Sequence, residues 1–288
     1  MEWLVTMKTR KATISDLKRM LEIEESAISG YGYLEENKEF YFDQKQNQGE
    51  MILALKNDFP VGMGQYSILP DGSGWLEILR VHQDYQHQGA GNAIYKRYLQ
   101  LAEETSAPSV AMFTGRRNIA SRALAEKNGF ELVCAQPEYK LPLQGITVTQ
   151  NHSFKCIHDL EIAKELLKDM NQKWDEFTGI NRTYFHTNEQ LIDYFIKNNM
   201  IYSDGTNTVV LGCRMLKHRG WYIAYLSGNL HQCIPFAIQR TQMEQLPLLT
   251  ISVPPKRTEL ITALEHYGFQ FVSELIVMER KFKTLEKN

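Results

Sequence analysis

Hydrophobic and polar positions follow two different periods along the chain, and each period indicates a kind of element. Residues 13–25 and 157–170 carry apolar side chains at helical spacing after an acidic cap, which predicts two similar amphipathic helices. Residues 75–81 (WLEILRV) indicate a strand, and residues 89–104 an amphipathic helix. Each half is expected to run strand, helices, three strands, helix, strand, helix and strands. This order predicts a mixed α/β (α+β) fold rather than a bundle or a barrel.

Three landmarks of the first half return in the second half. They are a capped helix start, a Gly-Trp pair that opens a strand, and a glycine that ends a short helix: Asp16 and Asp159, Gly74 and Gly220, Gly129 and Gly268. The separations are 143, 146 and 139 residues. Landmarks in one order at nearly constant spacing indicate an internal duplication. We therefore expect two domains, residues 1–146 and 147–288, joined by a short polar stretch near residues 145–152.

Composition narrows the classes of function. The 288 residues include 43% hydrophobic and 23% charged residues, with a formal net charge of -2, so no basic field favours nucleic acid as a partner. The sequence shows neither a signal peptide nor an apolar run long enough to span a bilayer, which predicts no membrane partner and a cytoplasmic location. The eight histidines form no HExxH motif and no Cys/His cluster, so we expect no metal site.

The stretch VHQDYQHQGAGNAIYK carries the strongest chemical signal, because a strand stops there and two glycines open a helix. At such a turn the first backbone N–H groups of the helix have no internal partner and attract an anion. A P-loop would require Gly-Lys-Ser/Thr, and a dinucleotide fingerprint would require Gly or Ala three residues after Gly91, where Ile94 stands. The pattern instead predicts a pyrophosphate held mainly by backbone amides.

The segment Gln86-His87-Gln88-Gly89-Ala90-Gly91 resembles the Gln/Arg-x-x-Gly-x-Gly/Ala signature of the GNAT superfamily of N-acetyltransferases. Leu79-Arg80-Val81 is similar to the family's strand end along pantetheine, and Asn118 begins a helix that leads to Gly129-Phe130, as in its second CoA-binding segment. The resemblance covers residues 8 to about 145. It implies two tandem GNAT-like domains, each a mixed, mostly antiparallel sheet flanked by helices, and acetyl-CoA as co-substrate. The binding residues it implies are Leu79, Arg80, Val81, Gln86, His87, Gln88, Gly89, Ala90, Gly91, Asn92, Asn118 and Ser121.

Acetyl transfer to an amine requires a base, because a lysine-like amine with a pKa near 10.4 is mostly protonated at neutral pH. By strand alternation Glu77 shares a face with Trp75, Leu79 and Val81, which makes Glu77 the candidate base, although it could equally be a paired strand charge. The resemblance implies that the N–H of Val81 stabilises the oxyanion. Family members often have a tyrosine acid where this chain has Ala125, and we consider Ser121 as a donor through water.

In the second half, an offset of 146 residues aligns QHQGAG with QCIPFA, so Pro235 and Ala237 stand where the glycines were. Proline has no N–H to offer a phosphate, and we expect this domain to be degenerate and to bind no CoA. Aromatic residues follow the first helix of the first half and resemble those that roof the acceptor pocket in the family: Tyr31, Tyr33, Phe40, Tyr41 and Phe42. Packing within the core would explain them equally well.

The favoured function is an N-acetyltransferase that moves acetyl from acetyl-CoA directly to a primary amine acceptor. The second domain would then shape the acceptor side or form a homodimer interface. A catalytically weak acyl-CoA-binding regulatory module is the alternative, motivated by Ala125, and a purely structural tandem scaffold is the third possibility. The acceptor cannot be named from the sequence, because acceptor loops carry no readable code.

Overall fold

The computed structural model describes residues 7–28, 32, 34–43, 45, 47–148 and 153–282. Tyr31, Tyr33 and residues 149–152 of the expected join lie outside these ranges. The chain packs as two compact units: unit 1 is Met1–Met112, Asn118–Leu132 and Met278–Asn288, and unit 2 is Phe113–Arg117 and Val133–Val277. The short segment Phe113–Arg117 thus belongs to unit 2, and the C-terminal segment Met278–Asn288 belongs to unit 1. The predicted boundary between the two domains, after residue 146, stays a prediction.

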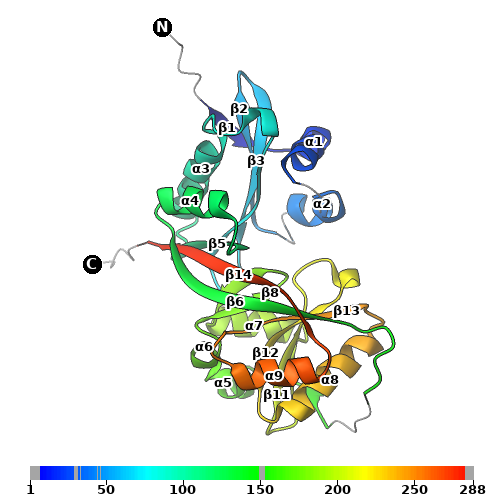
Figure 1. Cartoon of the computed structure of the whole chain (residues 1–288). Helices are drawn as coiled ribbons and strands as arrows, with labels where there is room; N and C mark the ends of the chain where they lie inside the picture. Colours follow the sequence, from blue (N-terminus) through cyan, green and yellow to red (C-terminus); the bar gives the residue numbers. More distant parts are fainter. Residues whose placement is uncertain are drawn as a thin grey trace, which may run out of the picture. The chain divides into compact units, whose positions relative to one another are not determined.

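Unit 1 has a mostly antiparallel sheet in the order β1-β2-β3-β4-β5, in which only β4 and β5 pair in parallel. Helices α1 and α2 lie on one face of this sheet, and α3 and α4 lie on the other (Figure 1). The elements are β1 (Lys8–Lys11), η1 (Ile14–Asp16), α1 (Leu17–Ala27), α2 (Leu34–Phe42), β2 (Gly49–Lys56), β3 (Phe59–Ile68), β4 (Gly74–Val81), η2 (Gln83–Tyr85), α3 (Ala90–Glu104), β5 (Ser109–Gly115) and α4 (Ile119–Lys127).

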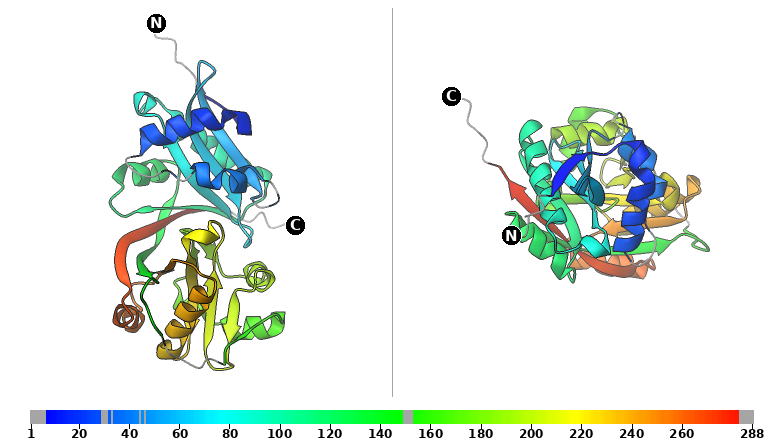
Figure 2. Two further views of the ribbon diagram at one scale, coloured as in Figure 1. Left: turned by 90° about the vertical axis from the view of Figure 1, so that its right-hand side faces the viewer. Right: turned by 90° about the horizontal axis from the view of Figure 1, so that it is seen from above.

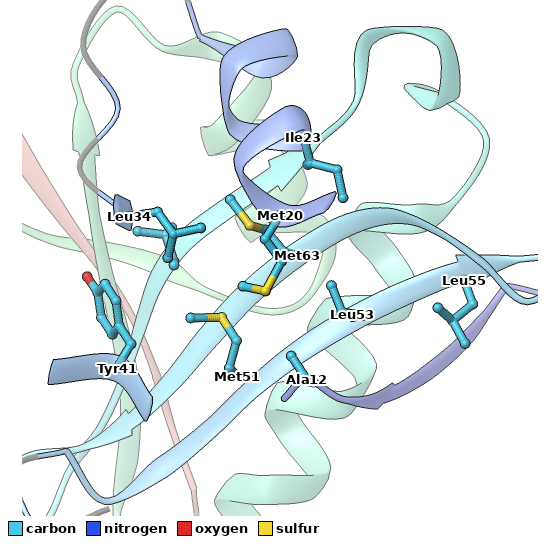
Figure 3. Close-up of a cluster of buried hydrophobic side chains, with 10 residues drawn as sticks. Ala12, Met20, Ile23, Leu34, Tyr41, Met51, Leu53, Leu55 and Met63 are labelled. Atoms are coloured by element: carbon cyan, nitrogen blue, oxygen red, sulfur yellow. The ribbon is translucent and has the colours of Figure 1, made fainter. Parts of the chain in front are cut away.

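A hydrophobic core fills the space between the sheet and helices α1 and α2. Met20 and Ile23 of α1 and Leu34 of α2 are fully buried against β2 and β3, where Leu53 and Met63 point toward them (Figure 3). The helical spacing seen in the sequence produces this arrangement, because it gathers the apolar side chains of α1 on the face that meets the sheet. The core therefore fixes α1 and α2 over the middle strands.

Helix α3 covers the opposite face and approaches β3 closely. A Cβ atom at Gly64 would lie 1.9 Å from the hydroxyl oxygen of Tyr98, and one at Gly62 would lie 3.5 Å from Ile94 Cδ1. Glycine at position 64 is therefore required for the buried Tyr98 ring to rest on the sheet. The Tyr98 hydroxyl donates to the backbone oxygen of Glu77, at 3.4 Å, which ties α3 to the middle of β4.

Unit 2 repeats this plan with the strand order β14-β6-β13-β12-β11-β10-β7 and with β12 and β13 parallel. It adds a hairpin, β8 and β9, that the sequence patterns did not indicate. Figure 2 gives two further views of its strands and helices. The elements are β6 (Glu131–Pro142), β7 (Lys155–Cys156), α5 (Leu160–Leu167), α6 (Met170–Lys173), β8 (Phe177–Ile180), β9 (Thr183–His186), α7 (Glu189–Lys197), β10 (Ile201–Ser203), β11 (Thr208–Gly212), η3 (Lys217–Arg219), β12 (Trp221–Ser227), α8 (Leu230–Met243), β13 (Leu248–Ser252), α9 (Thr258–His266) and β14 (Gln270–Lys281).

The glycine landmarks of the repeat have the same structural role in both units. Gly129 follows α4 with φ of 80°, and Gly268 follows α9 with φ of 87°. In each case the next N–H, from Phe130 or Phe269, returns to a carbonyl of the helix, at 3.1 and 3.0 Å. This left-handed helix end favours glycine because other residues are strained there. The predicted glycine helix ends are confirmed.

The start of α1 is held by a charged group of β1. Asp16 accepts hydrogen bonds from Arg10 Nη1 and Nη2, at 2.8 and 2.7 Å, and from the N–H of Thr13, at 2.9 Å. The Arg10 guanidinium is the main reason that the pKa of Asp16 falls from 3.8 to about 2. The ionised carboxylate is thus bound more favourably in the folded protein than in the unfolded chain.

Replacing Asp16 with Asn should lower the free energy of unfolding at neutral pH by about 1 kcal/mol, a value reduced because Arg10 is 42% exposed. Because the folded pKa is depressed, this stabilisation is present above the unfolded pKa near 4 and is lost as pH falls toward about 2. Urea unfolding of the parent and the variant across this range measures the difference.

The matched control is Asp58→Asn, since the Asp58 side chain is 84% exposed and lies 3.9 Å from Lys8. We expect this control to change stability by less than about 0.5 kcal/mol. An equal loss in both variants, or a loss in Asp16→Asn that does not depend on pH, would contradict the assignment.

Candidate functional site

Strand β4 contains one extra residue where it pairs with β3. The register joins Gln65 to Glu77 and Met63 to Arg80, so a single residue of β3 faces two residues of β4. At this bulge Ile78 has φ of 44°, in the left-handed region that β-branched residues rarely adopt. A bulge of this kind bends the strand and changes the face on which the following side chains lie.

The bulge corrects the alternation expected from the sequence. Glu77 and Trp75 keep the face predicted for them, but Val81 does not share it. Val81 instead lies on the α3 side, and Arg80 takes the face of Glu77. Leu79 lies within the bulge itself. The prediction was wrong beyond Glu77 because an inserted residue shifts the two-residue period by one.

The backbone of Val81 points away from β3. His82 donates its N–H to the oxygen of Val61, at 2.9 Å, which makes the adjacent Gly62 and Val81 a pair without mutual hydrogen bonds. In an antiparallel ladder the N–H and C=O of such a residue face the opposite edge. The oxygen of Val81 accepts a hydrogen bond from Gln86 Nε2, at 3.3 Å.

Pairing between β4 and β5 covers only part of β4. Residues 74–76 are registered with residues 110–112, and residues 77–81 extend beyond this parallel ladder. The β5-facing edge of β4 is therefore open to a ligand in this part of unit 1. The N–H of Val81 lies on that edge, as the predicted oxyanion role requires.

Glu77 is 9% exposed and is held on the face that carries α1 and α2. Its carboxylate accepts hydrogen bonds from Ser67 Oγ, at 2.6 Å, and from the hydroxyl of Tyr41, at 3.4 Å. Tyr41 extends from α2 beside the core (Figure 3). Within the described residues, two neighbouring buried atoms have no hydrogen-bond partner, Oε1 of Gln65 and Nε of Arg80. The surroundings of Glu77 are thus polar and incompletely satisfied.

The glycine loop leads into the start of α3, where Gly89 leaves open space. Gly89 has φ of 93°, and a Cβ atom added there would meet no described atom within 4 Å. Helix α3 begins at Ala90, and its first N–H to bond back is that of Ala93, at 3.0 Å from the oxygen of Gly89. The N-cap residue is Gly89, which has no side chain to cap this end. The N–H groups of Ala90, Gly91 and Asn92 can therefore accommodate an anion.

Gln88 of the motif and a lysine from outside it hold the loop in place. Gln88 Nε2 donates to the oxygen of Asp84, at 2.9 Å, and Gln88 Oε1 accepts from Lys56 Nζ, at 2.7 Å. Lys56 ends β2 and also lies over the ring of Tyr85, 5.6 Å from its centroid. Sequence reasoning missed this lysine because 32 residues separate it from Gln88, and no local pattern connects the two.

Helix α4 lies against the start of α3. A Cβ atom at Gly91 would approach Leu124 Cδ2 to 2.9 Å, and Asn128 Nδ2 donates to Asn92 Oδ1, at 3.4 Å. Asn118 caps α4 by accepting the N–H of Ser121, at 3.1 Å. The second predicted CoA-binding segment is thereby brought beside the glycine loop, whereas His87 lies exposed on it.

Ala125 is fully buried in α4, where the predicted tyrosine acid is missing. Its oxygen accepts the N–H groups of Asn128 and Phe130, at 2.9 and 3.1 Å. The nearby Tyr95 is buried with its ring against Phe130, and burial raises the pKa of its hydroxyl well above the usual 10. Ser121 is partly exposed, one turn before Ala125.

Unit 2 keeps the bulge and loses the loop. β12 is registered with β11 through Val210 with Tyr225 and Leu211 with Ile223, which leaves Ala224 as an extra residue. Between β4 and α3 unit 1 has residues 82–89, whereas between β12 and α8 unit 2 has only residues 228–229. The shorter connection leaves no counterpart of the glycine loop in unit 2. Pro235 and Ala237 lie inside α8, so their predicted alignment with the loop was wrong.

The start of α8 is closed by the protein's own side chains. Asn229 Oδ1 accepts the N–H of His231, at 2.9 Å, and Asn207 Oδ1 accepts the N–H of Asn229, at 2.7 Å. A Cβ atom at Gly228 would lie 2.3 Å from Asn207 Oδ1. The N–H groups that would attract an anion are thus already paired in part, unlike those of α3.

In the described ranges no three or more His, Cys, Asp or Glu side chains come together as metal ligands. No helix in the same part of the chain combines the length and apolar character that crossing a bilayer demands.

Comparisons with known proteins bear on the family and on the fold. Residues 17–130 match the model of the acetyltransferase (GNAT) family. No curated protein sequence matches the chain. Solved structures share the fold at low identity: a proposed acetyltransferase from Pyrococcus horikoshii has a TM-score of 0.63 at 16% identity, covering 98% of this chain and 91% of that one. A GCN5-related N-acetyltransferase from Sphaerobacter thermophilus has a TM-score of 0.62 at 10% identity, covering 96% of this chain and 95% of that one.

A tandem GNAT protein from the clavulanic acid biosynthesis pathway has a TM-score of 0.56 at 11% identity, covering 96% of this chain and 98% of that one. Its two-domain arrangement spans the same length as the two units described above. Residues 17–130 therefore resemble the acetyltransferase (GNAT) family, and the chain has the fold of two GNAT-like domains in tandem.

Proposed function

We propose that unit 1 binds acetyl-CoA and transfers its acetyl group directly to a primary amine. The observation that carries the proposal is the bulge at Ile78. It opens the β5-facing edge of β4, presents the N–H of Val81 there, and keeps Glu77 in a polar setting on the same strand. The resemblance of residues 17–130 to the acetyltransferase family supports this reaction class.

The pyrophosphate of acetyl-CoA would lie on the start of α3. Backbone N–H groups and the helix dipole favour a negative charge at this point, and Gly89 leaves space for close approach. Lys56, held 2.7 Å from Gln88, adds a positive charge to the loop. The pantetheine arm would run along the open edge of β4 beside Leu79 and Arg80, toward the N–H of Val81.

The acceptor amine would attack the thioester carbonyl carbon. The carbonyl oxygen takes the negative charge and accepts a hydrogen bond from Val81 N–H, the amine proton passes to Glu77, and the intermediate expels CoA as a thiolate. The backbone positions of residues 77 and 81 lie roughly 10–13 Å apart along the strand, so the proton would reach Glu77 through ordered water rather than directly.

The CoA thiolate then takes a proton from solvent. Because Ala125 stands in place of a tyrosine, that position of α4 provides no acidic side chain for the thiolate. Ser121 remains a candidate proton donor, acting through a water molecule. A thiol with a pKa near 8.5 leaves as a thiolate without help, so the absent acid slows the step without preventing it. The amine acceptor would occupy the polar surroundings of Glu77, where Gln65 and Arg80 carry unpartnered atoms.

Gly89→Ala should weaken acetyl-CoA binding at least about tenfold, because the new methyl group enters the space that the pyrophosphate requires. The control is Gly72→Ala, since Gly72 has φ of 85°, similar open surroundings and a place in a remote turn. Both variants should lose about 1 kcal/mol of stability from backbone strain. Calorimetric titration of acetyl-CoA separates the two effects, and equal binding by both variants would refute the assignment of the loop.

Glu77→Gln should reduce kcat with an amine acceptor by roughly 10²- to 10⁴-fold, the usual contribution of a general base, with little change in acetyl-CoA affinity. Glu50→Gln is the control: this carboxylate is also mostly buried in unit 1 but pairs with Arg97, at 2.9 Å. CoA release measured with a panel of amines tests both variants. Unchanged turnover in Glu77→Gln would rule out the base.

The acyl-CoA-binding module remains the second candidate, because Ala125 removes the usual acid. The two functions differ in one measurement. Sustained release of CoA that depends on an added amine supports the transferase. Binding of acetyl-CoA at one site per chain, without such release for any amine, supports the module.

A further inference from the structure

Unit 2 contains a group of buried polar atoms for which the described residues offer no hydrogen-bond partner. They come from four different elements or their ends: Gln136 Oε1, Trp174 Nε1, Tyr225 Oη and Arg257 Nη1. The Gln136 and Tyr225 residues are fully buried, Trp174 is 1% exposed, and the Arg257 side chain is 17% exposed. Folded proteins rarely leave such groups unpaired, because each loses its bonds to water and gains none.

These four side chains meet around Trp174. The Tyr225 ring packs edge-on against the Trp174 ring, with centroids 5.1 Å apart, and the Arg257 guanidinium lies 5.1 Å from the Trp174 ring centroid. Gln136 Nε2 donates to the backbone oxygens of Trp174 and Phe177, at 3.3 and 2.9 Å. The amide nitrogen is therefore used by the protein, and the amide oxygen is not.

Within the described residues of unit 2, the other buried polar side chains have hydrogen-bond partners, so the deficit is local. Tyr184 Oη donates to Ser252 Oγ, at 3.2 Å, and Thr178 Oγ1 donates to the oxygen of Ala224, at 2.6 Å. Glu138 accepts two hydrogen bonds from Arg182, at 2.9 and 2.7 Å. Because these buried groups have partners, we infer that the missing partners around Trp174 reflect a property of that place and not of the whole unit.

The position of this group repeats that of the candidate site in unit 1. Tyr225 directly follows the extra residue Ala224 in β12, as Leu79 follows Ile78 in β4. Arg257 directly precedes α9, as Asn118 precedes α4. The duplicated fold thus brings chemically different side chains to an equivalent location, even though the glycine loop of unit 2 is gone.

The unpaired atoms are mainly donors of hydrogen bonds. Trp174 and Arg257 offer N–H groups and Tyr225 offers O–H, whereas Gln136 offers one acceptor. Three donors that include a guanidinium suit a carboxylate, and the single acceptor suits an N–H group of the same ligand. We propose that unit 2 holds a binding site for a small carboxylate that carries an N–H donor, of the kind found in free α-amino acids. This site is independent of acetyl transfer in unit 1.

The test uses the full chain and measures thermal unfolding and calorimetric binding. The probes are the free amino acids, their carboxamides, and C2 to C6 mono- and dicarboxylates. At least one amino acid should raise Tm and bind at one site per chain, at least about tenfold more tightly than its carboxamide. Tyr225→Phe and Trp174→Phe, which keep an aromatic ring, should each weaken this binding by about tenfold or more. Glu77→Gln should leave it unchanged.

A second measurement distinguishes a ligand site from a site filled by ordered water alone. Without ligand, Tyr225→Phe should keep or raise Tm, because it removes an unpaired hydroxyl. The matched control Tyr184→Phe should lower Tm, because it removes the bond to Ser252. The proposal is wrong if no probe binds, if binding survives both aromatic variants, or if Tyr225→Phe lowers Tm as much as Tyr184→Phe does.

Discussion

A single extra residue in β4 organises most of what surrounds it in unit 1. One antiparallel ladder uses the N–H and C=O groups of alternate residues, so a regular strand that is paired on both sides has no backbone group left for a ligand. The bulge at Ile78 lies where the β5 ladder ends, and Glu77 and the N–H of Val81 flank it. Its strained backbone persists because Tyr98, fitted over Gly64, holds the oxygen of Glu77 from α3.

The need for free backbone N–H groups also explains why the positive charge beside the glycine loop comes from Lys56 of β2. The N–H groups at the start of α3 can bind an anion only if they stay uncapped, so the side chains that hold the loop must bond elsewhere. Gln88 solves this by bonding to Asp84 within the loop and to Lys56 of β2. The loop is thus fixed from behind, and its ligand-facing side stays open at Gly89.

Duplication allows the two units to diverge from one plan. Unit 2 retains the bulge at Ala224 and the parallel pairing of β12 with β13, which are properties of the backbone. It replaces the eight-residue loop by two residues and closes the start of α8 with Asn207 and Asn229. The unpaired polar atoms around Trp174 are then the chemical feature that distinguishes unit 2 from unit 1. A fold fixes where a site lies, whereas side chains decide what it binds.

The sequence alone determined the α/β class, the repeat, the glycine helix ends and the open start of α3, because these depend on local periods and on φ angles that favour glycine. It could not reveal the bulge, since Ile78 carries no turn signal and the compensating Gly64 lies on another strand. The face of Val81 and the partner of Gln88 were likewise decided by tertiary structure. Each depends on register or on contacts between distant segments, which a one-dimensional pattern does not encode.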